Sequence, residues 1–172
     1  MNNIYLIGFM GTGKTTVAKN LQKFLPFQLV EMDEAIERVE AMTIPEIFEK
    51  KGEEGFRMAE TQLLSIISKE KNQIISCGGG IVLKPENISI MKETGTVVRL
   101  TSSPEVIYER VNRNSNRPLV QGKDLSEIQK MIDSREKYYA DAADIVVDSG
   151  INTPEEVASE IIKQLALNGR LN

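Results

Sequence analysis

The stretch Gly8-Phe9-Met10-Gly11-Thr12-Gly13-Lys14-Thr15 has the pattern G-x-x-x-x-G-K-T. The residues before it, 4–7, form an apolar, β-prone run typical of a buried parallel strand. The residues after it are apolar at helical spacing, namely Val17, Ala18, Leu21, Phe24 and Leu25. A strand, a glycine-rich loop and a helix, in that order, are the context in which this pattern forms a phosphate-binding loop.

The residue types of this loop suit a nucleoside triphosphate. Glycines allow positive φ and let backbone N–H groups approach phosphate oxygens, and the N-terminus of the helix adds partial positive charge. We expect Lys14 to reach the β- and γ-phosphates and the Thr15 hydroxyl to ligate Mg²⁺. The alternative is an ordinary glycine-rich turn, but at average residue usage a chain of this length matches the pattern by accident only about one time in two hundred.

Composition excludes several other classes of protein. The chain has 172 residues, enough for one domain with a core, and its net charge of −4 argues against a general nucleic-acid binder. It has one cysteine and no histidine, which removes disulfide frameworks, histidine bases and histidine-containing zinc sites. We find no apolar run of about 20 residues and no signal peptide, so we expect no membrane span and a cytoplasmic location.

Strand-like and helix-like segments alternate along the chain, which predicts an α/β fold. We expect a three-layer αβα arrangement, a five-stranded parallel sheet with helices on both faces. Because ligands bind beyond the carboxyl ends of such strands, the loops that begin at Gly8, Glu31, Gly78, Thr101 and Asp148 should share one rim. Capping-box patterns begin helices after Thr43, Asp124 and Thr153, and the first of these helices is expected to stop near Gly52, with another over 56–69.

Acidic and basic residues near the second strand suggest a second part of the site. Glu31 and Asp33 point the same way if the segment is extended, so one could serve Mg²⁺ and the other a substrate hydroxyl; they could also simply begin a solvated helix. Arg57 and Glu60 lie three residues apart on a predicted helix and can touch. Arg57 could grip a substrate carboxylate while Glu60 holds its guanidinium, or the two could form an ordinary surface ion pair.

Two loops carry further signals. Gly78-Gly79-Gly80 follows a buried strand, where it indicates either a close approach of backbone to ligand or a loose turn. The adjacent Cys77 is expected to be a small buried apolar residue rather than a nucleophile. The polar stretch 112–124 contains Arg117, which could lie on a lid that closes over the transferring phosphoryl group, or be a solvated loop charge.

Taken together, these motifs resemble the shikimate kinase family. The resemblance spans nearly the whole chain and rests on the loop at 8–15, the acid-x-acid pair at 31–33, G-E-E-G-F-R-x-x-E at 52–60, the triplet at 78–80, R-P-L at 117–119 and R-x-x-Y at 135–138. It implies a single P-loop kinase domain over 1–172, with a substrate-binding region at about 31–60 and a mobile lid at about 112–124. The implied reaction transfers the γ-phosphate of ATP to the 3-hydroxyl of shikimate, in aromatic amino-acid biosynthesis.

The resemblance also implies a role for each matching residue. Asp33 would bind the substrate hydroxyls and accept the 3-hydroxyl proton, as part of a catalytic set with Lys14 and Arg117. Arg57 and Arg135 would clamp the carboxylate. Glu60, Gly79 and Gly80 would line the same pocket. The ATP site would comprise Gly11, Thr12, Gly13, Lys14, Thr15, Thr16 and Arg117, with Arg110 and Pro154 around the adenine.

One position departs from the family's pattern, and two other functions compete. The first acid of the pair is Glu31, where the family usually has aspartate, although the extra methylene still lets a glutamate reach a metal-bound water. The competitors are a P-loop kinase of gluconate or a nucleoside monophosphate, and a nucleotide-binding switch without turnover. The motif at 52–60 and the glycine triplet argue against the first competitor. No apolar stripe requires a larger assembly, so we expect a monomer.

Overall fold

A single parallel sheet organises the molecule, and the computed structural model describes residues 2–113 and 118–171. Its five strands lie in the order β2-β3-β1-β4-β5, with every pair parallel. They are β1 (Asn3–Ile7), β2 (Gln28–Glu31), β3 (Gln73–Ser76), β4 (Gly95–Thr101) and β5 (Ile145–Asp148). The predicted α/β fold with five parallel strands is confirmed.

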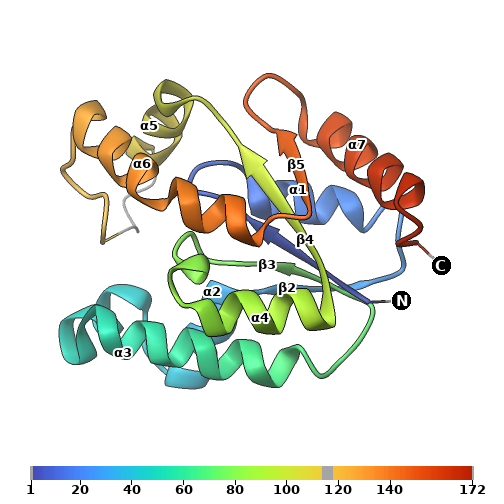
Figure 1. Ribbon diagram of the computed structural model, residues 1–172. Coiled ribbons are helices and arrows are strands. Elements are labelled where there is room, and N and C mark those ends of the chain that lie inside the picture. Colours follow the sequence, from blue (N-terminus) through green and yellow to red (C-terminus); the bar gives the residue numbers. More distant parts are fainter. Residues whose placement is uncertain (1, 114–117, 172) are drawn as a thin grey trace.

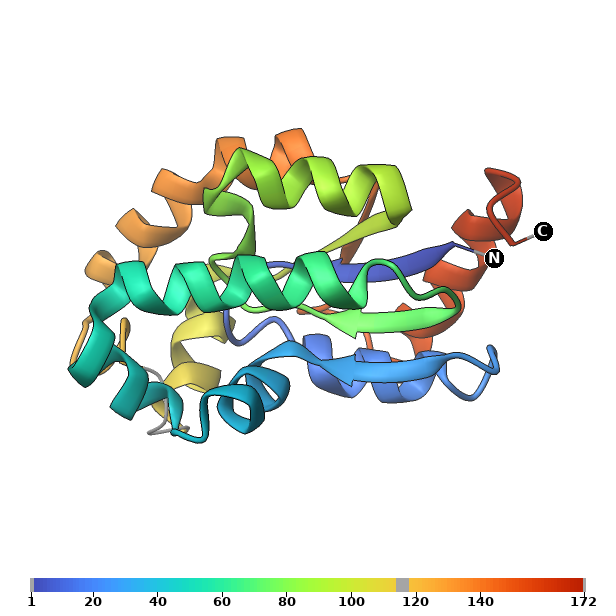
Figure 2. The ribbon, with the colours of Figure 1, turned by 90° about the horizontal axis from the view of Figure 1, so that it is seen from below.

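Helices cover both faces of this sheet (Figures 1 and 2). One face packs against α1 (Lys14–Leu21) and α7 (Pro154–Leu167). The other packs against α3 (Ile44–Ile67), α4 (Pro85–Thr94) and α6 (Leu125–Ala142). Alternation along β1 feeds both cores, because Tyr5 and Ile7 point to the second face while Ile4 and Leu6 point to the first. The strand is therefore buried on both sides, as its continuous apolar run indicates.

The strand order places the loop after β1 at the point where the sheet reverses direction. The chain leaves β1 for β2, returns to β3 beside β1, and then adds β4 and β5 on the other side. Connections on either side of this point diverge and leave a crevice at the carboxyl ends of the strands. Two short helices lie at this end, α2 (Met32–Glu40) and α5 (Pro104–Asn112).

Two local predictions need correction. The first helix ends at Leu21, so Phe24 does not continue its apolar face and is 45% exposed. Asp33 lies in the first turn of α2 rather than in an extended segment, so strand alternation does not relate it to Glu31. The predicted helix end near Gly52 is confirmed, because the two helical parts of α3 meet there at a kink, where φ is 69° and ψ −179°; the second part begins directly after the kink rather than at residue 56.

The three predicted helix starts are confirmed. Thr43, Asp124 and Thr153 each accept a hydrogen bond from the backbone of the residue three positions on, and each forms the reciprocal capping box. A short 3₁₀ helix, η1 (Ile81–Leu83), follows the glycine triplet and was not predicted. Within residues 2–113 and 118–171, no helix combines the length and the apolar character needed to cross a membrane.

Candidate active site

The loop after β1 lines a cleft of about 330 Å³ at the carboxyl ends of the strands. Gly11 and Gly13 have φ of 84° and 87°, values that glycine adopts without strain, and α1 begins directly after them at Lys14. Its N-terminus, which offers N–H donors and partial positive charge, is therefore at the cleft. The lining includes Gly11, Gly13, Lys14, Thr15 and Thr16 of the loop, and also Glu31, Asp33 and Arg110.

The lysine of the loop is held by the loop itself. The Lys14 ammonium is buried and donates to the carbonyl oxygens of Gly8 and Phe9 at 2.7 and 3.0 Å. Thr12 is also buried, and its hydroxyl donates to the same Phe9 carbonyl at 2.8 Å. The Thr12 side chain thus shapes the loop, while Lys14 places its charge where phosphate oxygens would lie.

Thr15 and Glu31 come together at one side of the cleft. The Thr15 hydroxyl donates to Glu31 Oε2 at 3.1 Å, and Glu31 Oε1 is buried with no hydrogen-bond partner in the described part of the chain. Burial raises the pKa of the Glu31 carboxyl above its ordinary value, an effect that hydrogen bonds with Thr15 and Ser76 oppose. A hydroxyl and a carboxylate are the oxygen donors that Mg²⁺ prefers, so these residues fit the ion.

In the part of the chain that the structure describes, side chains alone do not complete a metal site. Among residues 2–113 and 118–171, no three or more His, Cys, Asp or Glu residues gather closely enough to hold a metal ion. Mg²⁺ commonly keeps waters and phosphate oxygens and takes only one or two protein ligands. The Thr15–Glu31 pair is therefore consistent with an ion that arrives with the nucleotide.

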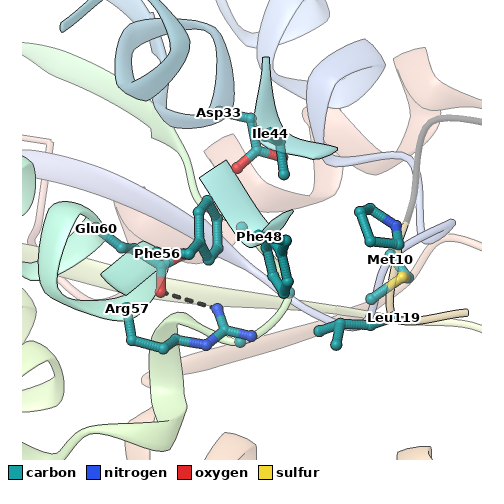
Figure 3. Close-up of a pocket in the computed structure, with 12 residues that line it drawn as sticks. Met10, Asp33, Ile44, Phe48, Phe56, Arg57, Glu60 and Leu119 are labelled. Atoms are coloured by element: carbon teal, nitrogen blue, oxygen red, sulfur yellow. Dashed lines mark hydrogen bonds and ion pairs between the residues drawn. The ribbon is translucent and has the colours of Figure 1, made fainter. Parts of the chain in front are cut away.

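A second cavity adjoins the first and is smaller and less polar (Figure 3). One wall is apolar and comprises Met10, Ile44, Phe48, Phe56, Pro118 and Leu119. The polar lining comprises Asp33, Arg57, Glu60 and the glycines 78–80. Asp33, Gly78 and Gly79 line both cavities, so the two adjoin at these residues.

Arg57 and Glu60 form a buried ion pair inside this second cavity. Arg57 Nη1 lies 3.0 Å from Glu60 Oε1 (Figure 3). Arg57 Nη2 lies 3.4 Å from Glu53 Oε1. The predicted contact is confirmed, and the alternative of an ordinary surface pair is wrong. Burial raises the pKa of Glu60 to about 7, although Arg57 and Arg135 act to lower it and Asp33 adds to the rise.

The glycine triplet lies among these charged groups. A Cβ on Gly78 would lie 2.8 Å from Glu60 Oε2 and 3.1 Å from Asp33 Oδ1, and a Cβ on Gly80 would collide with the Arg57 guanidinium. The loose-turn interpretation is therefore wrong, because side chains approach this backbone closely. Cys77 beside it is fully enclosed, and burial raises the pKa of its thiol, as expected for a packing residue rather than a nucleophile.

Arg135 reaches the same glycines from α6. It is only 5% exposed, its guanidinium lies 5.4 Å from the centre of the Phe9 ring, and Nη1 lies 3.5 Å from where a Cβ of Gly79 would be. Tyr139, one turn further along α6, donates its hydroxyl to the Gly79 carbonyl. The R-x-x-Y motif ends at Tyr138, which is 40% exposed, whereas the tyrosine that contacts Gly79 is Tyr139, at the i, i+4 spacing from Arg135.

A third cavity, of about 270 Å³, continues from the phosphate-binding loop toward α7. Arg110 and Pro154 both line it, so the structure brings together the two residues predicted to surround adenine. Arg110 donates to the Gly11 carbonyl at 3.1 Å and to the Ser149 carbonyl at 3.5 Å. Ser149 was not predicted; its buried hydroxyl lies 2.6 Å from the carbonyl of Thr12, directly after β5 at the rim of the sheet.

Arg117 belongs to the segment 114–117, outside the described residues, so its predicted place over the phosphates stays a prediction. The described parts of the proposed lid are partly packed. Pro118 and Leu119 line the second cavity, and Val120 is buried in the core.

The phosphate-binding loop, the parallel sheet and the adjoining cavity define the class of P-loop kinases that act on small molecules. A family model described as shikimate kinase matches residues 10–166, and the chain belongs to the shikimate kinase family. A shikimate kinase of Thermodesulfovibrio yellowstonii is 45% identical over 165 residues, which cover 95% of each chain.

Solved structures agree with this assignment. The structure of a shikimate kinase from Acinetobacter baumannii in complex with shikimate has a TM-score of 0.93 and 35% identity, and the match covers 100% of this chain and 96% of that one. A shikimate kinase from Aquifex aeolicus has a TM-score of 0.86 and 40% identity over 97% of this chain and 98% of its own.

Proposed function

We propose that this chain transfers the γ-phosphate of ATP to the 3-hydroxyl of shikimate. The observation that carries the proposal is the position of two buried arginines beside the glycine triplet, Arg57 against Gly80 and Arg135 beside Gly79. Two guanidinium groups suit one carboxylate, and the apolar wall opposite suits the carbon ring of a small acid. This acceptor cavity opens onto the phosphate-binding cleft, which is the geometry that a direct transfer needs.

Asp33 is the proposed catalytic carboxylate. It lines both cavities, so it lies where an acceptor hydroxyl would meet the donor phosphate. We propose that it orients the 3-hydroxyl and accepts its proton, with Glu60, Gly79 and Gly80 completing the acceptor pocket. The absence of histidine from the sequence leaves a carboxylate as the base.

Positive charge and positioning would supply most of the catalysis, because phosphoryl transfer needs little covalent help from the protein. Lys14 and Arg117 would stabilise the transferring group, the loop from Gly11 to Thr16 would bind the phosphates, and Arg110 and Pro154 would hold the adenine. Thr15 and Glu31 would hold Mg²⁺, which, when bound, neutralises part of the phosphate charge.

We propose the following wider organisation. Residues 31–60, which include α2 and the part of α3 that carries Arg57 and Glu60, would form the substrate-binding region of a single kinase domain. Residues 112–124 would form a mobile lid. The protein would work as a monomer in the cytoplasm, as its composition and modest net charge suggest.

The test is the release of ADP from Mg-ATP with shikimate, gluconate or a nucleoside monophosphate as acceptor, or with no acceptor. We expect release to depend on shikimate and the product to be shikimate 3-phosphate, identified by phosphorus NMR. Nucleotide binding without any acceptor-dependent release would support a switch instead, and faster turnover of another acceptor would support a different kinase. An Asp33→Ala variant that keeps both its fold and full turnover would refute the role of Asp33.

A further inference from the structure

Two residues of α6, one turn apart, lie behind the acceptor cavity and contact Gly79 in its lining. Arg135 and Tyr139 are i, i+4 neighbours and both are buried, with Tyr139 only 1% exposed. The Tyr139 hydroxyl donates to the carbonyl of Gly79, a residue that lines both the acceptor cavity and the phosphate-binding cleft. Burial raises the pKa of Tyr139 to about 12, so the phenol stays neutral and remains a donor at physiological pH.

This hydrogen bond fixes more than one atom of the pocket. The peptide between Gly79 and Gly80 is trans, so its N–H points opposite to its C=O. With the carbonyl directed at Tyr139, the Gly80 N–H must point to the other side. The Arg57 guanidinium lies against the same Gly80, with no room for a Cβ between them. The orientation of this one peptide therefore sets both a backbone donor and the surface on which Arg57 rests.

Tyr139 is itself held from β4. The Arg99 guanidinium lies 5.2 Å from the centre of the Tyr139 ring. Arg99 also makes two hydrogen bonds to Glu136 of α6, Nη1 to Oε1 at 2.8 Å and Nη2 to Oε2 at 2.6 Å. These bonds lower the pKa of Glu136, so its carboxylate stays ionised at neutral pH. A continuous set of contacts thus runs from Glu136 through Arg99 and Tyr139 to Gly79.

We propose that Tyr139 is a positioning residue for the acceptor: its hydroxyl holds the Gly79–Gly80 peptide, and its helix turn holds Arg135, in the arrangement that receives the carboxylated substrate. This inference rests on the proposed function. It predicts an effect on the binding of the acceptor and not on that of ATP. The reason is that none of these contacts involves the residues proposed to bind adenine or the lysine of the phosphate-binding loop.

The test uses two neighbouring tyrosines as a matched pair. Tyr139→Phe keeps the ring, and with it the contact to Arg99, but removes the donor. We expect the KM for shikimate to rise about tenfold, the effect of leaving one buried carbonyl unpaired, while the KM for ATP stays within about twofold. Tyr138→Phe removes the same hydroxyl from an exposed position on the same helix and should change neither constant.

Three outcomes would overturn the inference. The first is a Tyr139→Phe enzyme with the wild-type KM for shikimate. The second is a Tyr139→Phe enzyme in which the Tm and kcat fall while both KM values stay unchanged. That result would mean that the hydroxyl only stabilises the fold. If Tyr139→Phe does not fold, Glu136→Gln replaces it, because it changes an exposed carboxylate at the far end of the same set of contacts. We expect Glu136→Gln to raise the KM for shikimate by a smaller factor. The third outcome that would overturn the inference is a Glu136→Gln enzyme with the wild-type KM for shikimate.

Failure of the proposed function gives a different result. A wild-type protein without shikimate-dependent ADP release would overturn that function, and the inference with it. An active wild type beside an unaffected Tyr139→Phe variant would overturn the inference alone.

Discussion

The Arg57 guanidinium and the Glu60 carboxylate lie 3.0 Å apart, with side chains that are only 9% and 0% exposed. The second oxygen of Glu60, Oε2, and the Nε of Arg57 are both buried. Neither atom has a hydrogen-bond partner among the residues that the structure describes. A buried ion pair with unsatisfied atoms contributes little net stability, because the loss of hydration offsets the attraction between the charges. The pair is better explained as an arrangement that holds the Arg57 guanidinium ready for a ligand.

Replacing Arg57 by lysine tests this explanation. Lysine keeps the charge but lacks the planar fork that binds a carboxylate at two points, so we expect the KM for shikimate to rise on the order of 100-fold, with a much smaller change in the KM for ATP. Steady-state kinetics with each substrate varied in turn give both constants. Arg113→Lys is the control, because Arg113 pairs with Glu109 on the exposed surface of α5. Equal KM values for shikimate in the two variants would contradict the role of Arg57.

The raised pKa of Glu60 predicts a pH-dependent stability. The folded protein binds the Glu60 proton up to about pH 7, whereas the unfolded chain releases it near the ordinary value of 4.5. Between these pH values the unfolded state binds fewer protons, so the free energy of unfolding falls as the pH rises. The Glu60 contribution to stability is thus complete below about pH 4.5 and is lost by the time the pH has passed about 7.

Glu60→Gln isolates this effect from the other titrating groups. Urea unfolding of both proteins at pH 5 and pH 8 gives the difference in stability between them. We expect the wild type to lose, relative to the glutamine variant, on the order of 1–3 kcal/mol between the two pH values. A difference that is the same at both pH values would show that Glu60 titrates normally.

The hydrogen bond between Thr15 and Glu31 predicts how ATP binding depends on the Mg²⁺ concentration. We expect Glu31→Gln to require about tenfold more Mg²⁺ for half-maximal ATP binding, because a carboxylate that orients a metal ligand is replaced by a neutral amide. Calorimetric titrations of ATP at a series of Mg²⁺ concentrations measure this directly and need no turnover. Glu31→Asp is the matched control, since it keeps the carboxylate and should stay near the wild type. An unchanged Mg²⁺ requirement in Glu31→Gln would remove Glu31 from the metal site.

We expect Ser149 to affect the binding of ATP and not that of shikimate. Its hydroxyl lies 2.6 Å from the Thr12 carbonyl and 3.0 Å from that of Thr101, so it ties the phosphate-binding loop to the end of β4. We expect Ser149→Ala to raise the KM for ATP about fivefold, as for one lost buried hydrogen bond, and to leave the KM for shikimate unchanged. Ser159→Ala, at an exposed position on α7, is the control. A parallel rise in both KM values would indicate a general loss of structure instead.

The sequence predicts those features that depend on neighbours along the chain. The phosphate-binding loop, the three capping boxes and the Arg57–Glu60 contact all follow from spacings of a few residues. The contacts that the sequence did not reveal join distant segments: Tyr139 and Gly79 are 60 residues apart, and Ser149 and Thr12 are 137 apart. The burial of Arg135 has the same origin, because its guanidinium lies over the Phe9 ring and beside Gly79, two residues far from it in the sequence.

The kink at Gly52 confirms the helix end that the sequence predicts there. The backbone at Gly52 is a conformation essentially restricted to glycine, and the helix resumes after this one residue, which the spacing of apolar residues did not reveal. Phe48 before the kink and Phe56 after it pack with ring centres 5.0 Å apart, and both line the acceptor cavity. The kink therefore sets how the two halves of α3 meet around the substrate.

We therefore expect Gly52→Ala to impair shikimate binding as well as stability. A Cβ at Gly52 would meet nothing within 4 Å, so the cost is backbone strain alone, about 1–2 kcal/mol in the free energy of unfolding. Relief of that strain by a change in the kink would move Phe48 away from Phe56 and raise the KM for shikimate several-fold. Gly169→Ala is the matched control: it has a φ of 65°, equally open surroundings and a position beyond the end of α7. Urea unfolding measures the loss of stability in each variant, and kinetics should separate them. If the two variants have the same KM for shikimate, the kink does not shape the acceptor cavity.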